Sequence, residues 1–150
     1  MVDSRAKGAR AESKVAQVLS QHTGLKWRRT PGSGALNEEH MLKGDVYVPG
    51  EHNLYCVEIK NYKDDKISSK MLTDKISQIE IWWQQTLRQA KQVQKRPLLI
   101  FKFDRSKLFC AVEEIDLNKQ NSRYLYYSPL GVFILKLEDW LIENKPIFIK

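Results

Sequence analysis

Three charged side chains, Asp45, Glu58 and Lys60, lie within one short stretch of the chain, residues 44–60. On a shared surface, the two carboxylates could hold a divalent cation, because hard oxygen ligands suit Mg²⁺, and the amine could hold a phosphate oxygen or a water. A cation held beside a phosphate makes a site for metal-assisted hydrolysis of a phosphodiester. Whether the three side chains share a surface depends on the strands that carry them.

The segment consists of two runs in which apolar and polar residues alternate, as they do in a β-strand with two different faces. Turn-forming residues lie between the runs, which predicts a hairpin with a four-residue loop at residues 50–53. In that register Asp45 lies opposite Glu58, roughly 4.5–5.5 Å apart at Cβ, and Lys60 is on the same face. The apolar residues of the two runs line the other face: Val46, Val48, Val57 and Ile59.

Two carboxylates about 5 Å apart repel each other by roughly 3 kcal/mol at an effective dielectric constant near 20, and a bound cation removes this cost. A solvated strand face is the alternative interpretation, since Glu-x-Lys patterns are common on exposed sheets. The register is also an assumption, because a slip of one residue moves Asp45 to the opposite face. The two strands alone therefore leave both interpretations open.

The length and composition of the chain predict a single globular domain over residues 1–150 with a hydrophobic core. No apolar run approaches the ~20 residues of a membrane-spanning helix, and the N-terminal residues lack the apolar core of a signal peptide. Cys56 and Cys110 lie in separate strand-like runs, which favours free thiols over a disulfide. We therefore expect a cytoplasmic protein with no membrane partner, acting in the host-cell cytoplasm if its source is viral.

Positive charge is concentrated at the N-terminal end of the chain. The formal net charge is +7, and the first thirty residues contain seven basic residues against Asp3 and Glu12. A positive field of this kind favours a polyanionic partner, and the lack of a basic amphipathic helix with a bulky apolar face favours nucleic acid over a membrane surface. Five of these basic residues are predicted to contact phosphates: Arg5, Lys7, Arg10, Arg28 and Arg29.

A helix is predicted over residues 4–21, with Ser4 as its N-cap. Glu12 lies on the inward edge of the apolar stripe of this helix, where apolar residues recur at the helical period. A carboxylate in that position is costly unless another group pairs with it. Glu12 therefore either joins a site with other charged groups, or is a boundary residue that reaches solvent or a basic neighbour on the same helix.

The remaining predicted elements are strands at residues 25–30, 98–103, 108–112, 124–127 and 132–137, a loop at 35–43, a long helix from Thr73 or Asp74 to about Gln94, and a short helix at 137–144. Their order predicts an α/β fold with a central mixed β-sheet flanked by helices: an antiparallel meander, a crossover helix and a strand that returns alongside. Trp82 and Trp83 of the long helix are predicted to be core or subunit-contact aromatics.

The pattern resembles the PD-(D/E)xK nuclease superfamily and, within it, the archaeal-type Holliday-junction resolvases. Residues 61–150 resemble these resolvases only in the order of their elements. Where the family often has Arg directly after the first-helix Glu, this chain has Ser13. The motifs that carry the resemblance are, in chain order, Lys7-Gly8, Glu12, the segment Arg29-Thr30-Pro31-Gly32-Ser33-Gly34, Gly44-Asp45 and Glu58-Ile59-Lys60.

The resemblance implies a restriction-endonuclease-like core and a Mg²⁺-dependent endonuclease, with Mn²⁺ as a substitute, acting as a homodimer on four-way DNA junctions. It implies that Asp45 and Glu58 bind the metal, with the Ile59 carbonyl as a further ligand. Glu12 would approach the same metal from the first helix through a water. Lys60 would orient or help to deprotonate the attacking water, and Ser33 would lie on a loop that closes on the scissile phosphate.

A junction would be recognised by the spacing of two active sites in a dimer, for which the candidate contact is the apolar surface around Trp82, Trp83 and the C-terminal strands. Three alternatives remain: another endonuclease of the same superfamily that cuts duplex or otherwise branched DNA, a basic DNA-binding module without catalysis, and a structural or protein-interaction domain.

Overall fold

The computed structural model describes residues 4–31, 43–118 and 123–150. In this part of the chain, seven strands form one sheet in the order β1-β2-β3-β4-β5-β7-β6. The strands are β1 (Arg28–Arg29), β2 (Val46–Tyr47), β3 (Tyr55–Tyr62), β4 (Arg96–Phe103), β5 (Leu108–Glu113), β6 (Leu125–Tyr127) and β7 (Val132–Lys136). The helices are α1 (Ser4–Thr23), α3 (Lys70–Thr73), α4 (Gln78–Gln92), the 3-10 turn η1 (Glu114–Asp116) and α5 (Leu137–Asn144).

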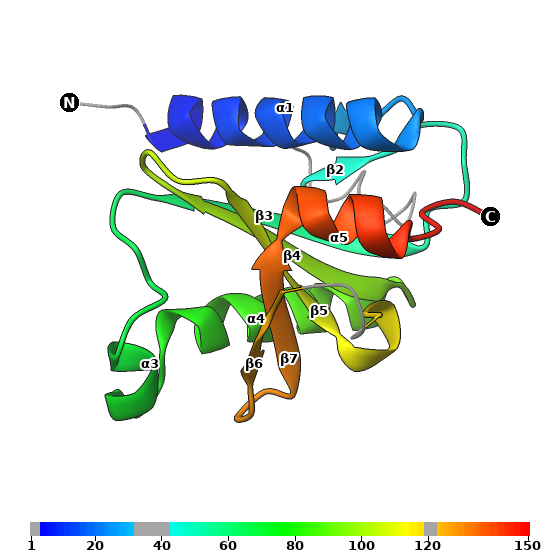
Figure 1. Cartoon of the computed structure of the whole chain (residues 1–150). Helices are drawn as coiled ribbons and strands as arrows, with labels where there is room; N and C mark the ends of the chain where they lie inside the picture. Colours follow the sequence, from blue (N-terminus) through cyan, green and yellow to red (C-terminus); the bar gives the residue numbers. More distant parts are fainter. Residues whose placement is uncertain (1–3, 32–42, 119–122) are drawn as a thin grey trace.

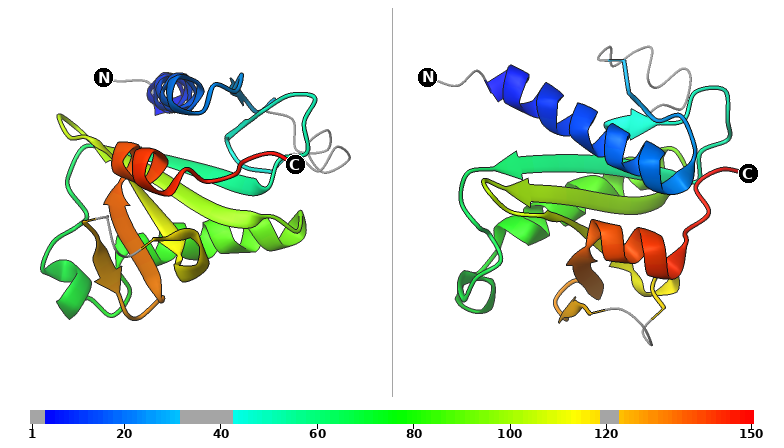
Figure 2. Two further views of the ribbon diagram at one scale, coloured as in Figure 1. Left: turned by 45° about the vertical axis from the view of Figure 1, so that its right-hand side comes forward. Right: turned by 45° about the horizontal axis from the view of Figure 1, so that its top comes forward.

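Helices cover both faces of the sheet. Helices α1 and α5 lie on one face and α4 lies on the other, as Figures 1 and 2 show. Each face has its own apolar cluster: Val57, Ile100 and Trp140 belong to the cluster beneath α1 and α5, and Phe101 and Trp82 belong to the one beneath α4. The predicted α/β fold with a central mixed sheet flanked by helices is confirmed.

Strands β2 and β3 form the predicted antiparallel hairpin, with Val46 paired to Val57 as expected. The loop between the strands is closed by the buried side chain of Asn53. Its Oδ1 accepts from the Val48 N–H at 2.7 Å, and its Nδ2 donates to the Val48 carbonyl at 2.9 Å. Because one amide side chain satisfies both polar groups of Val48, the loop length is fixed and the register cannot easily slip.

Strands β3 and β4 are parallel neighbours, paired from Tyr55 with Arg96 to Tyr62 with Phe103. Parallel neighbours require a crossover connection, which here contains α3 and α4. The strands after β4 continue antiparallel, and β7 is inserted between β5 and the edge strand β6. The crossover places α4 directly beneath the face of β3 that carries Glu58 and Lys60.

The long helix begins later than predicted. Helix α4 starts after Ser77, whose Oγ accepts from the Glu80 N–H at 3.2 Å, and α3 forms a separate turn before it. The sequence Ser77-Gln-Ile-Glu80 matches a capping box, which the helical period of the apolar residues obscured. Ile76 consequently precedes the helix, although the predicted bounds included it, and its side chain is 62% exposed.

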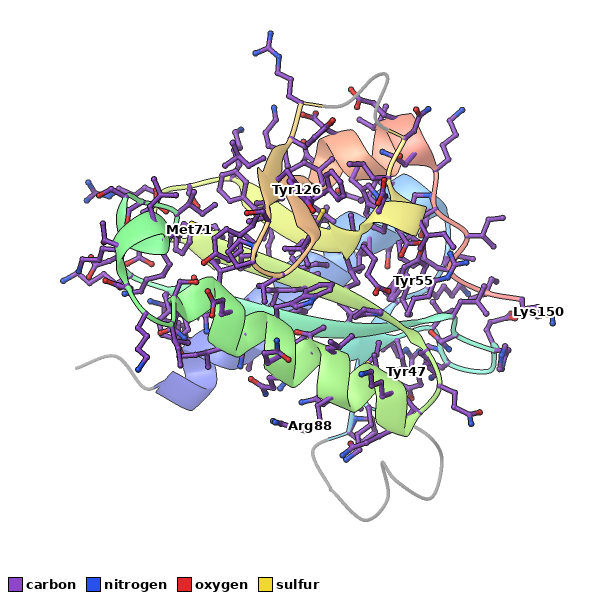
Figure 3. All side chains as sticks on the ribbon, turned by 90° about the horizontal axis from the view of Figure 1, so that it is seen from below. Tyr47, Tyr55, Met71, Arg88, Tyr126 and Lys150 are labelled. Carbon is purple, nitrogen blue, oxygen red and sulfur yellow. The ribbon has the colours of Figure 1, made fainter. Side chains whose placement is uncertain are left out.

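Both tryptophans of α4 are buried in the chain's own core, with exposed fractions of 1% for Trp82 and 3% for Trp83. The prediction that they are core residues is confirmed, and neither side chain reaches the surface. The exposed apolar side chains of the C-terminal strands are Leu125 and Tyr126 on the edge strand β6. Figure 3 shows Tyr126 on that strand, away from α4.

The first predicted strand is shorter than expected, because only Arg28 and Arg29 pair with β2. Cys56 and Cys110 are free and buried, as predicted. Among the described residues, no helix combines the length and apolar character that crossing a membrane requires.

Candidate active site

Gly44 brings the chain close to β3 just before Asp45. Its φ is +92°, and a Cβ at this position would lie 2.7 Å from the carbonyl oxygen of Val57. Only glycine tolerates both the positive φ and this approach. The next residue, Asp45, donates its backbone N–H to the same Val57 carbonyl at 2.7 Å. The Gly44-Asp45 pair therefore has a structural cause: glycine lets the Asp45 backbone dock against β3.

The Asp45 side chain is held by the backbone of β3. Its Oδ2 accepts from the Ile59 N–H at 2.7 Å. Backbone groups of a strand alternate in direction, so Ile59 directs its N–H and its carbonyl to the same side as Val57, toward β2. Because β2 pairs with β3 at Val46 and Val57, the Ile59 carbonyl lies beyond that pair, on the edge of β3 that the Asp45 carboxylate contacts.

Glu58 is buried and is contacted by two side chains. The Lys60 Nζ lies 3.3 Å from Glu58 Oε1, and the Gln85 Nε2 of α4 donates to the same oxygen at 3.3 Å. Glu58 and Lys60 therefore share one face of β3, as predicted, and this face looks toward α4. This contact joins a helix of the crossover to the candidate site. Figure 3 views this face, with α4 lying across the sheet.

Burial makes both carboxylates hard to ionise, and nearby negative charge adds to this effect. Burial, then the charge of Glu58, raise the pKa of Asp45 to about 7, against the lowering effect of the Ile59 N–H. Burial also raises the pKa of Glu58, and the charge of Lys60 opposes that rise. The charge of Glu58 is the second cause of the raised pKa of Asp45, as expected for two carboxylates that the hairpin register brings near each other.

Glu12 approaches the pair but does not join it. Its charge raises the pKa values of both Asp45 and Glu58, so it lies within electrostatic reach of them. Its carboxylate is bound instead to Arg29, whose Nε donates to Glu12 Oε2 at 2.9 Å. In the part of the chain that the structure describes, no group of three or more His, Cys, Asp or Glu side chains is arranged to hold a metal ion.

The donors that are present fit a divalent cation. The carboxylates of Asp45 and Glu58 and the carbonyl of Ile59, on the edge of β3 that Asp45 contacts, are hard oxygen donors of the kind that Mg²⁺ prefers. Their charge is poorly tolerated without a cation, since the pKa of Asp45 rises to about 7. Two donor side chains and one carbonyl leave further coordination positions for water and substrate, as is usual for Mg²⁺.

The predicted phosphate contacts have different surroundings. Lys7 lies 3.3 Å from Asp104 in the turn between β4 and β5, so a phosphate would compete with that carboxylate. Arg10 and Arg28 are exposed, and Arg29 is bound to Glu12. The side chain of Arg5 and all of Ser33 lie outside the described residues.

Gln85 is the site residue that the sequence interpretation missed. The buried stripe of α4 is wide, because Trp82 is buried as well as Trp83. Gln85 follows Trp82 by three residues and therefore lies on the flank of the buried face, toward the sheet. The signal in the sequence was a polar residue, Gln85, three positions after an aromatic residue, Trp82, that was expected to be buried.

Comparison with known proteins gives three findings. A family of phage PDDEXK endonucleases matches residues 3–145 of the chain. Protein D14 of Escherichia phage T5 is 42% identical over 148 residues, which cover 93% of this chain and 92% of that protein. Hjc of Archaeoglobus fulgidus, a Holliday junction resolvase, matches with a TM-score of 0.44 and 15% identity over 89% of each chain, a similarity too low to transfer a function.

Proposed function

The chain belongs to the phage PDDEXK endonuclease family, and from that premise we propose that it is a Mg²⁺-dependent endodeoxyribonuclease that resolves four-way DNA junctions as a homodimer. The observation that supports the catalytic part is the nearness of Asp45 to Glu58 and Lys60: the charges of both act on Asp45, whose carboxylate is bound to the Ile59 N–H of β3. Burial and the charge of Glu58 raise the pKa of Asp45 to about 7, so this is a pair that gains from a cation.

Asp45, Glu58 and the Ile59 carbonyl are the proposed metal ligands, with Mn²⁺ as an acceptable substitute for Mg²⁺. When bound, the metal supplies Lewis-acid stabilisation of the phosphate and lowers the pKa of a water that attacks it. Asp45 is positioned for this role because the Ile59 N–H occupies only one of its oxygens, Oδ2. Glu58 has a second oxygen besides Oε1, the atom that Lys60 and Gln85 contact.

Lys60 is the proposed residue for proton transfer and charge compensation at the attacked phosphate. Its Nζ lies 3.3 Å from Glu58 Oε1, which orients the amine across the face of the strand. An ammonium in this position stabilises the extra negative charge that develops on the phosphate oxygens. As a neutral amine, the same group could accept a proton from the attacking water.

Glu12 and Arg29 are proposed to change partners when DNA binds. Arg29 would transfer its contact from the Glu12 carboxylate to a phosphate, because both are oxyanions that a guanidinium binds. Glu12 would then face Asp45 and Glu58 and could reach the metal through a water. Ser33, which lies outside the described residues, is proposed to contact the scissile phosphate.

The junction substrate and the homodimer are supported by the motif order Lys7-Gly8, Glu12, Arg29 to Gly34, Asp45 and Glu58 to Lys60, which resembles that of the archaeal-type resolvases. Paired cuts at a crossover require two active sites, and a dimer supplies them. The place of action would be the host-cell cytoplasm. Another branched or linear duplex substrate is the second candidate, because the same site would cut it equally well.

The experiment compares an immobile four-way junction with a linear duplex of matching sequence, each incubated with protein and Mg²⁺. Paired symmetric nicks near the crossover, lost in Asp45→Asn, are expected. Equal cutting of both substrates would favour the second candidate function, cleavage of linear duplex or other branched DNA, over junction resolution. Tight binding without cleavage in Mg²⁺ or Mn²⁺ would contradict the catalytic proposal.

A further inference from the structure

A second cluster of charged side chains lies apart from the candidate active site. Four lysines from separate elements line a cleft of about 330 Å³, together with Ser106 and Glu138. Lys14 comes from α1, Lys102 and Lys107 from β4 and the β4–β5 turn, and Lys136 from the end of β7. We call it the lysine cleft. In Figure 1 the β4–β5 turn lies beside the N-terminal half of α1.

The lysine cleft has more positive charge than nearby carboxylates can neutralise. Lys136 lies 3.5 Å from Asp139, and Lys102 donates to the Phe103 carbonyl at 3.3 Å. Lys14 and Lys107 are exposed and form no ion pair with any described residue. Ammonium groups brought together from three elements repel one another, so the cleft is an environment that favours an anion.

The cleft continues along the surface of α1. A second depression on this helix shares Lys14 with the cleft and also contains Arg10 and Gln17. Arg10, Lys14 and Gln17 are spaced by four and three residues, so they lie on one exposed stripe of the helix. The two depressions together form an extended basic surface, which suits a chain of phosphates better than a single small anion.

This surface lies on the opposite side of α1 from the candidate active site. Glu12, which pairs with Arg29 at the β1 edge, and Lys14 are two residues apart, which is about 200° around a helix of 3.6 residues per turn. The cleft is bounded by β4, β5 and β7, whereas Asp45 lies at the β2 edge of β3. One DNA segment at Asp45 and another in the cleft would therefore straddle α1.

We propose that the lysine cleft binds the backbone phosphates of a second DNA arm, while a first arm occupies the active site. This rests on the proposed function, and it gives a reason for the preference for branched DNA. The contacts are to phosphates, so they position the substrate and carry no sequence information.

The test uses the Asp45→Asn chain as its parent, so that DNA is bound and not cut. Lys14, Lys107 and Lys136 are replaced together by Ala, and the matched control replaces three other exposed lysines, Lys70, Lys75 and Lys150. The cleft variant is expected to bind the four-way junction at least tenfold more weakly than the parent. It is also expected to lower the slope of log K against log salt by about 2–3 units, at ~0.9 per lost phosphate contact. Losses no larger than those of the control would overturn the proposal.

Two further experiments distinguish a second stretch of DNA from a small anion as the occupant of the lysine cleft. A short linear duplex, which fills only the active site, is expected to lose less affinity than the junction, and equal losses would overturn the second-arm assignment. Inorganic phosphate is titrated by calorimetry: phosphate binding that disappears in the cleft variant, with junction affinity unchanged, would assign the cleft to a small anion instead.

Folding and function are checked independently. Thermal unfolding of the cleft variant should match that of the parent. If the cleft variant unfolds at a lower temperature, the single variant Lys107→Ala, in an exposed turn, is used in its place. Lys107→Ala should reproduce part of the loss in junction affinity, and no loss in that variant would overturn the proposal. A parent chain that binds no DNA of any form would overturn the proposed function and this inference together. A parent that binds the junction normally, with an unaffected cleft variant, would overturn the inference alone.

Discussion

Arg29 holds the carboxylate of Glu12 through a contact of 2.9 Å between Nε and Oε2. The sequence interpretation gave these residues separate tasks, Arg29 at a phosphate and Glu12 at a metal, and the structure joins them to each other. Their side chains are 49% and 23% exposed, and exposed ion pairs contribute about 0–1 kcal/mol. A pair this weak can be exchanged for a phosphate or a cation, so the contact is compatible with both assigned tasks.

Replacing Arg29 by Ala is expected to weaken DNA binding and to lower the slope of log K against log salt by about 0.9 units, the value for one phosphate contact. The slope is measured from binding titrations between low and moderate salt, in the uncleaving Asp45→Asn background. Lys75→Ala, which removes an exposed charge before α4, should leave it unchanged. An unchanged slope in Arg29→Ala would mean that Arg29 serves only Glu12.

The metal-free protein is expected to lose stability as pH rises from about 4 to about 7, because the pKa of Asp45 is raised from 3.8 to about 7. In this range the folded state keeps a proton that the unfolded state has lost, so the stabilising contribution is complete at low pH and disappears as pH passes the folded-state value. Asp45→Asn lacks this titration and should be more stable than the unmodified protein at pH 8 by on the order of 2 kcal/mol.

The measurement is the free energy of unfolding in urea at pH 5 and pH 8, for the unmodified protein and for Asp45→Asn, with a chelator present. All other groups titrate in both proteins, so the difference between them isolates Asp45 and its effect on Glu58. Adding Mg²⁺ at pH 8 should restore stability to the unmodified protein and not to Asp45→Asn. Identical pH dependence in the two proteins would show that Asp45 ionises without penalty.

Glu58→Gln is expected to lower the cleavage rate by about 10²–10³ or more while DNA affinity is kept or increased. The variant removes a negative charge from a site that must approach a phosphate, and its amide remains polar in the same buried position. Cleavage is measured under single-turnover conditions and affinity by direct titration with Ca²⁺. A loss of affinity above tenfold in a correctly folded variant would contradict the role assigned to Glu58.

Gly44→Ala tests the cause of the Asp45 position. The added Cβ would lie 2.7 Å from the Val57 carbonyl oxygen, and the φ of +92° is unfavourable for alanine. Strain at one such residue costs on the order of 1–3 kcal/mol, and relief would move Asp45 away from β3. We expect lower stability in urea and loss of cleavage together. Gly50→Ala is the control: its φ is +77°, but a Cβ there meets no atom within 4 Å, so stability should fall with cleavage retained.

The hairpin at the site could be predicted because its residues carry two independent signals, period-two alternation and a turn-forming loop, and they agree on the pairing of Val46 with Val57. The start of α4 was predicted wrongly because the apolar period continues through Ile76, whereas the Ser77 cap decides where the helix begins. Local hydrogen bonding there outweighs the hydrophobic pattern.

Contacts between side chains of elements far apart in the sequence were harder to predict. The sequence placed Glu12 on the inward edge of the first helix, yet nothing in its spacing indicated that Arg29 would reach it across 17 positions. Lys7 likewise meets Asp104, whose turn is adjacent only once β4 and β5 are in the sheet. Side-chain partners of this kind depend on how helices sit over the sheet, which a one-dimensional period does not encode.

Gln85 is predicted to be a positioning residue for Glu58. Its Nε2 donates to Glu58 Oε1 at 3.3 Å, the same atom that Lys60 contacts. Gln85→Ala should leave DNA affinity nearly unchanged and lower the cleavage rate by about tenfold, because Glu58 gains rotational freedom while the groups that bind phosphate remain. Gln84→Ala, on the exposed side of α4, is the matched control and should cleave as the unmodified protein does.

Gln85→Glu separates positioning from simple packing. A carboxylate beside Glu58 would raise the pKa of Glu58 further, since like charges disfavour ionisation. The pH at which cleavage is half-maximal should therefore move upward in Gln85→Glu, while Gln85→Ala lowers the rate without that displacement. Rate–pH profiles at saturating Mg²⁺ measure both. Coincident profiles for the two variants would mean that Gln85 only fills space beneath the sheet, because a packing role is sensitive to size and not to charge.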